Sequence, residues 1–90
     1  MENLDYDRIP EHMRDSMRGY IEHGKDIGDF LYALLCDDIP GAFSKADDTN
    51  RDAMYEYVCF LHDEAPSTAW GSPEAVSDWI KRGGMQGIAE

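Results

Sequence analysis

Three histidines and two cysteines are the residues of this chain best suited to ligate a metal ion. They are His12, His23, His62, Cys36 and Cys59. Zinc sites are usually marked in a sequence by close pairs such as Cys-x-x-Cys or His-x3-His, and none of these residues forms such a pair. We therefore predict that the chain holds no metal ion.

Cys59 and His62 are the most plausible pair for nucleophilic catalysis, because side chains three residues apart share one face of a helix. A thiol nucleophile also needs an oriented base and a pocket, and the sequence marks neither. Acidic residues are so abundant that neighbouring carboxylates are expected by chance. Gly83-Gly84 follows a helical pattern, which is the wrong order for a phosphate-binding loop. We predict that the protein is not an enzyme and uses no cofactor.

Acidity is the chemical property that stands out. The chain has 19 acidic residues against 8 lysines and arginines, for a net charge of −11. Residues 29–78 hold eleven acidic residues against Lys45 and Arg51, a net charge of −9. Such a field repels nucleic acid and anionic lipid and attracts basic protein surfaces. We predict a protein partner with a basic surface, and no direct binding to nucleic acid or membrane.

A ridge of acidic side chains is predicted on one helix. At about 100° per residue, Asp52, Glu56 and Asp63 fall within about 40° of one another. Cys59 shares this face, although free cysteine is usually buried, so we expect a neighbour in the chain, a second copy or a partner to cover it. With Asp48 near the start of the helix, these residues form the predicted partner-binding set. The alternative is a solvated face that keeps the protein soluble.

About five short helices are predicted to position this ridge. Apolar residues at helical spacing place them near 10–23, 26–36, 39–46, 50–65 and 73–82. Asp48 or Thr49 is expected to cap the fourth helix and Ser72 the fifth, with Gly24 and Gly83 as stop signals. The predicted core includes Met13, Met17, Tyr20, Ile21, Ile27, Phe30, Leu31, Leu34, Leu35, Phe43, Met54, Tyr57, Val58, Leu61, Val76, Trp79 and Ile80. Tyr32 and Tyr55 lie off these stripes, either as interface anchors or as padding of a small core.

Ninety residues fit one domain. We predict a compact all-α, single-domain bundle over residues 9–84, a flexible acidic arm at 1–8 and a flexible tail at 85–90. The longest apolar run, residues 30–36, is far below the roughly 18 residues of a membrane span, and the acidic start is unlike a signal peptide. These features favour a cytoplasmic protein with two free thiols.

Several short stretches form a pattern when they are taken together. They are Ile9-Pro10-Glu11-His12-Met13, Tyr20-Ile21-Glu22-His23-Gly24, Phe30-Leu31, Ala46-Asp47-Asp48-Thr49-Asn50-Arg51, Phe60-Leu61, Ala65-Pro66 and Trp70-Gly71-Ser72-Pro73-Glu74. The pattern, over about residues 8 to 80, resembles a family of small bacteriophage and prophage proteins. The resemblance implies a phage accessory protein in the bacterial cytoplasm and brings no catalytic residue with it.

Small acidic phage inhibitors, anti-CRISPR proteins among them, are an analogy of size, charge and setting. We therefore expect a protein that binds and modulates or inhibits a host protein, for example one of a defence system such as CRISPR-Cas. The alternative is a self-associating structural or regulatory phage module whose homodimer covers Cys59. An enzyme ranks third.

Overall fold

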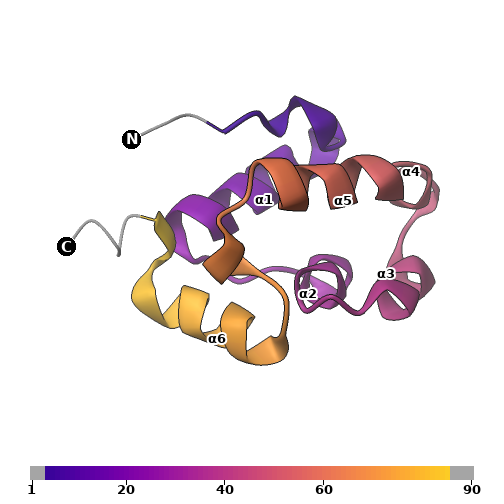
Figure 1. Cartoon of the computed structure of the whole chain (residues 1–90). Helices are drawn as coiled ribbons and strands as arrows, with labels where there is room; N and C mark the ends of the chain where they lie inside the picture. The colour runs from indigo at the N-terminus through magenta and orange to yellow at the C-terminus, as the bar shows by residue number, and fades with distance from the viewer. Residues whose placement is uncertain (1–3, 86–90) are drawn as a thin grey trace.

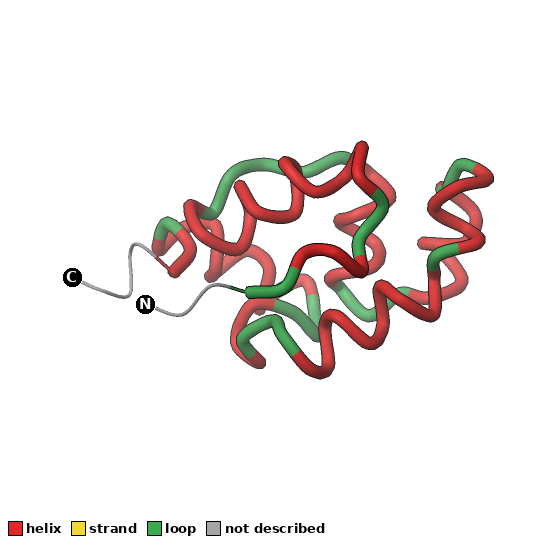
Figure 2. The backbone as a smooth tube through the Cα atoms, turned by 90° about the horizontal axis from the view of Figure 1, so that it is seen from above, coloured by secondary structure: helices red, strands yellow, loops and turns green. Residues whose placement is uncertain are grey.

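The computed structural model describes residues 4–85, which form six α-helices and two short 3-10 helices. In chain order these are η1 (Tyr6–Arg8), α1 (Glu11–His23), α2 (Asp29–Leu35), α3 (Ile39–Lys45), α4 (Asp48–Asp52), α5 (Met54–Asp63), η2 (Ser67–Ala69) and α6 (Pro73–Arg82). Figure 2 shows helices and loops but no strand in the described part of the chain. The predicted all-α bundle is confirmed.

The helices form two layers around one core. In Figure 1, α1, α4 and α5 run across the upper layer with η1 above them, and α2, α3 and α6 lie below. The radius of gyration is 12.0 Å, close to the value of about 12 Å expected for a compact chain of this length. The largest fully buried side chains include Tyr20, Tyr57, Phe60 and Trp79, which come from both layers.

Local stop and start signals act where the sequence predicts them. Gly24 ends α1 in the left-handed conformation at φ 68°, and Gly83 ends α6 in the same way at φ 84°. The Ser72 side chain caps α6 by accepting a hydrogen bond from the Ala75 N–H over 3.1 Å. These residues fix the lengths of α1 and α6.

The last helix is held against α1 by Trp79. Its indole N–H donates to the carbonyl oxygens of Tyr20 and Ile21, at 3.0 and 3.2 Å. The two helix ends also meet backbone to backbone, because a Cβ atom on Gly84 would lie 2.6 Å from the amide nitrogens of His23 and Gly24. Only glycine fits this contact.

The predicted fourth helix is wrong as a single element. It breaks at Ala53 into α4 and α5, and Asp47 caps its start in place of Asp48 or Thr49. The break is stabilised by a buried contact, in which the Tyr57 hydroxyl donates to Asn50 Oδ1 over 2.7 Å. No residue between 50 and 63 is a helix breaker, so the local sequence does not mark the change.

Two predicted core residues lie on the surface. Phe43 and Val58 are each 42% exposed, whereas Ala42 and Phe60 are buried. The reason on α5 is that the ring of Tyr6 packs against Phe60 at a centroid distance of 5.4 Å. The buried face of α5 is therefore turned toward η1 and away from Val58.

The predicted flexible arm, residues 1–8, contains the 3-10 helix η1, and its flexibility stays a prediction. Tyr6 is buried, as is Ile9 directly after the arm, and Asp5 caps η1 by accepting a hydrogen bond from the Asp7 N–H over 3.0 Å. At the other end of the chain, Met85 packs against the core. Residues 1–3 and 86–90 lie outside the described residues, and with them the rest of the predicted arm and tail.

Candidate functional site

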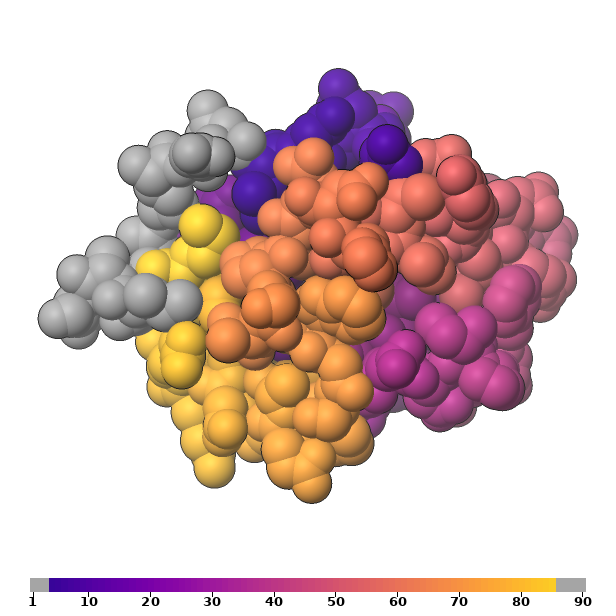
Figure 3. All heavy atoms as spheres, viewed as in Figure 1, coloured from indigo at the N-terminus to yellow at the C-terminus, as the bar shows by residue number. Residues whose placement is uncertain are grey.

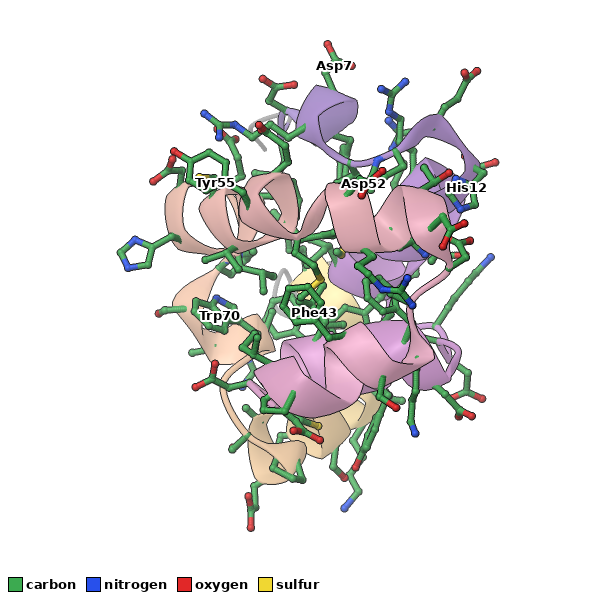
Figure 4. All side chains as sticks on the ribbon, turned by 90° about the vertical axis from the view of Figure 1, so that its right-hand side faces the viewer. Asp7, His12, Phe43, Asp52, Tyr55 and Trp70 are labelled. Atoms are coloured by element: carbon green, nitrogen blue, oxygen red, sulfur yellow. The ribbon has the colours of Figure 1, made fainter. Side chains whose placement is uncertain are left out.

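The predicted partner-binding residues lie along α4 and α5, but they do not form one continuous ridge. Asp48, Asp52 and Asp63 are exposed, and the Asp48 side chain retains 97% of its accessibility. Glu56 and Cys59 are half-buried. Figure 4 shows Asp52 on the outer side of α4, and Asp7 of η1 above it. We call Asp5, Asp7, Asp48, Asp52, Glu56 and Asp63 the acidic face.

The start of α4 is fixed by Asp47. Its Oδ1 accepts a hydrogen bond from the Asn50 N–H over 2.7 Å, and its Oδ2 lies 3.3 Å from His12 Nε2 on α1. The backbone hydrogen bond from Asn50, and to a smaller extent His12, lowers the pKa of the Asp47 carboxyl below its usual value. Asp47 therefore acts as a cap that ties α4 to α1.

Arg8 divides the ridge at its centre. Its guanidinium lies 3.5 Å from Glu56 Oε1, and Cys59 and Asp63 are also close enough to influence it. Partial desolvation lowers the pKa of Arg8, but its neighbours Cys59, Glu56 and Asp63 together raise it above its usual value. Both partners of the ion pair are exposed by more than a third, so the pair contributes little to stability. Its main effect is to neutralise the middle of the acidic face.

Cys59 is half-buried, so the chain itself covers part of this side chain. The neighbouring Cys59 thiol is the main cause that raises the pKa of the Tyr55 hydroxyl. Tyr55 is the most exposed large apolar residue of the described chain, at 73%. A second copy or a partner as a further cover of Cys59 stays a prediction.

The segment that carries Arg8 is held by several contacts that the sequence analysis missed. The Arg14 side chain donates to the carbonyl oxygens of Ile9 and Asp7, at 2.9 and 3.1 Å. The Asp5 N–H donates to Glu64 Oε1 over 3.2 Å. The available signal was a capping Asp5 followed by two apolar residues three positions apart, Tyr6 and Ile9. This segment adds Asp5 and Asp7 to the acidic face.

A small hollow opens on the other flank of α5. It is lined by Leu61, His62, Ala65, Ser67 and Trp70 and has a volume of about 190 Å³. Small-molecule sites usually range from about 300 to 1,000 Å³, so this hollow is too small for a typical cofactor. We call it the apolar hollow.

The chemical groups around the hollow do not form a catalytic arrangement. His62 and Ser67 both line it, but no hydrogen bond joins them in residues 4–85. Within the same range, no group of three or more His, Cys, Asp or Glu side chains is close enough to hold a metal ion. Cys36 and Cys59 are free thiols, and burial is the main cause that raises the pKa of Cys36.

Comparison with known proteins assigns no family to this chain. No family model, no curated protein and no solved structure matches it. The resemblance to phage proteins stays a prediction. None of the helices that the structure describes has both the length and the apolar character that crossing a bilayer requires.

Proposed function

We propose that this protein is a phage accessory protein of the bacterial cytoplasm that binds a basic surface of a host protein through its acidic face. By occupying that surface it modulates or inhibits the host protein. The observation that carries the proposal is the placement of Asp52 and Asp63, the last residues of α4 and α5. Both are exposed, and neither has an ion-pair partner within 4.0 Å in the described chain.

The position of Asp63 is unfavourable for an acidic residue, because a helix dipole favours cations in the last turn by about 0.3–1 kcal/mol. Asp52 lies where α4 ends and α5 begins, so the two helix dipoles oppose each other there. The stability of α5 therefore does not explain why Asp63 is acidic, and recognition of a basic partner would. Complementary charge raises association rates and excludes partners of the wrong sign.

The kind of host protein follows from the same charge. Proteins that grip nucleic acid present lysine and arginine to the phosphates, so an acidic face competes for that surface. A defence system such as CRISPR-Cas depends on surfaces of this kind. The proposal names a nucleic-acid-binding host protein as the target, with binding that weakens as salt is added.

Charge reversal tests the proposal. Asp52→Lys with Asp63→Lys changes two exposed side chains, and the lysine at position 63 suits the last turn of α5, so the variant should stay folded. The matched control reverses Asp26 and Asp78, two exposed acids outside the acidic face. Affinity purification from bacteria, with identification by mass spectrometry, should recover a basic protein with the wild type and the control but not with the D52K/D63K variant. Equal recovery with all three would contradict the proposal.

A second candidate function is self-association as a structural or regulatory phage module. The observation in its favour is the exposure of Tyr55, Val58 and Phe43 on the α3 and α5 side of the molecule. Such apolar side chains would be covered in a homodimer. Sedimentation at micromolar concentrations distinguishes the two functions, because a strict monomer would rule out this one.

A further inference from the structure

The apolar hollow lies outside the acidic face, so binding through acidic side chains gives it no role. Its walls come from the last turn of α5, from η2 and from the loop that follows, and Leu61 forms its base as a core residue. Figure 3 shows the orange surface of α5 and η2 meeting the magenta surface of α2 and α3 on this side. A volume of about 190 Å³ fits one side chain of a partner better than a whole small molecule.

The two tryptophans of the chain differ in how they are held. Trp79 is 1% exposed and its indole N–H makes two hydrogen bonds to α1. Trp70 is partly exposed at the hollow, and its indole N–H is buried without an acceptor among the described residues. Tryptophan in such a pocket is a frequent centre of binding energy.

Exposed apolar side chains continue the surface beyond the hollow. Val58 lies one helical turn before Leu61 and His62 on α5 and is 42% exposed. Figure 4 shows Phe43 of α3 and Trp70 on the same side, both below α4 and α5. An apolar strip therefore leads from Phe43 and Val58 to the hollow.

The rim of this strip is acidic. The Gly71 N–H donates to the Leu35 carbonyl oxygen over 2.7 Å, which brings the Trp70 loop beside the end of α2. Asp37 and Asp38 come just after α2, so they lie near this loop, and both are exposed. Asp63 and Glu64 lie toward η1 instead, near Arg8 and Asp5. Arg8 lies toward Glu56, on the η1 side of α5. An apolar guest is therefore favoured when its flanks are basic.

We propose that the apolar hollow receives a leucine-sized apolar side chain of a partner segment whose neighbouring residues are lysine and arginine. The inference rests on the proposed function for the basic character of the partner, and it adds the element that the partner inserts. A lysine or arginine beside the inserted residue faces Asp37 and Asp38, the exposed acids near the Trp70 loop. The buried apolar contact holds the complex that charge assembles.

Model peptides test the inference directly. The probe is a short, blocked peptide of lysine and arginine with one central leucine, and its control has alanine in place of the leucine. Burial of the extra methylene and methyl groups predicts about tenfold tighter binding of the leucine peptide. Calorimetry measures the affinities, and NMR shift mapping should centre the response on Val58, His62 and Trp70. Equal affinity of the two peptides would overturn the inference.

Matched variants of the protein control for charge and fold. Val58→Lys and Tyr32→Lys add the same charge at helical positions of similar exposure, 42% and 47%, but Tyr32 is not part of the strip. Val58→Lys should remove the leucine preference, and Tyr32→Lys should keep it at about tenfold. Val58→Thr, which adds no charge, should reduce the preference as well. A preference unchanged in both Val58 variants would place the leucine elsewhere and overturn the inference.

The outcomes separate this inference from the proposed function. A D52K/D63K variant that loses both peptides, while the wild type binds them equally, supports the acidic face and refutes the role of the hollow. A leucine preference that survives this charge reversal with full affinity supports the hollow and refutes docking through Asp52 and Asp63. If the protein instead dimerises and Val58→Lys abolishes the dimer, a second copy covers the strip and the inference of a basic partner is wrong.

Discussion

The hydrogen bond between Tyr57 and Asn50 sets the position of α4 relative to α5, and with it the shape of the acidic face. The Tyr57 hydroxyl donates to Asn50 Oδ1 over 2.7 Å, and both residues are buried. Tyr57→Phe removes the donor and leaves the Asn50 oxygen buried without it, which costs about 1–3 kcal/mol. The ring contact with Phe30, at a centroid distance of 5.2 Å, is kept. We therefore expect the free energy of unfolding to fall by about 2 kcal/mol.

Urea unfolding followed by circular dichroism measures this change, and for a domain of this size it corresponds to a Tm lower by roughly 10 °C. Tyr55→Phe is the control, since that hydroxyl belongs to an exposed side chain and its loss should change stability by less than about 0.5 kcal/mol. In a double-mutant cycle, Asn50→Ala with Tyr57→Phe should cost less than the sum of the single changes, because each removes the same bond.

Additive costs in that cycle would refute the reasoning. So would a Tyr57→Phe variant with the unfolding midpoint of Tyr55→Phe. Either result would mean that the contact between Tyr57 and Asn50 does not stabilise the break at Ala53. The relative placement of α4 and α5 would then need another cause.

Three further predictions concern the packing of the helix ends, the buried phenols and the cover of Cys59. Gly84→Ala should destabilise the protein by more than about 3 kcal/mol in thermal unfolding, because the φ of 69° at this position disfavours alanine and the added Cβ would meet the α1 backbone. Gly28→Ala is the control, since a Cβ at that position has open space around it and should cost much less. Equal effects of the two substitutions would contradict the close packing at Gly84. Burial raises the pKa values of Tyr6, Tyr20 and Tyr57, while the unfolded chain titrates them near their usual value of about 10. The unfolded state therefore loses these protons first as the pH rises. The free energy of unfolding is kept below about pH 10 and falls above it by about 1.4 kcal/mol per pH unit for each phenol. A free energy of urea unfolding that does not change with pH above about pH 10 would exclude this effect. Arg8→Ala should change stability by less than about 1 kcal/mol but speed maleimide labelling of Cys59 and not of Cys36, whereas unchanged labelling would show that Arg8 does not protect the thiol.

Local signals were enough to predict the parts of the fold that depend on neighbours in sequence. Ser72 and Pro73 start α6, and Gly24 and Gly83 end two helices, because capping and left-handed glycine act within a few residues. The break at Ala53 is stabilised by the hydrogen bond between the buried side chains of Tyr57 and Asn50, and no local sequence signal predicts that bond.

For the candidate site, too, only the features that follow from local helix geometry could be predicted from the sequence. Exposure of Asp52 and Asp63 follows from the period of the helix, since both lie opposite the apolar residues. The ion pair of Glu56 does not, because its partner Arg8 lies about fifty residues earlier in the chain. The apolar hollow also joins segments through a long-range contact, between Gly71 and Leu35. Such long-range contacts cannot be predicted from a sequence pattern and are seen only in the folded structure.

Magnitudes indicate why an acidic face and an apolar hollow belong together on α5. Exposed ion pairs contribute about 0.2–1 kcal/mol each, and association costs at least about 4 kcal/mol in lost translation and rotation. A few exposed acids such as Asp52 and Asp63 therefore offset that cost at best and leave little net affinity at physiological salt. Burying a leucine side chain adds about 2 kcal/mol, which salt does not screen. Under the functions proposed above, charge selects the partner and speeds its approach, and the hollow beside Trp70 lengthens the life of the complex.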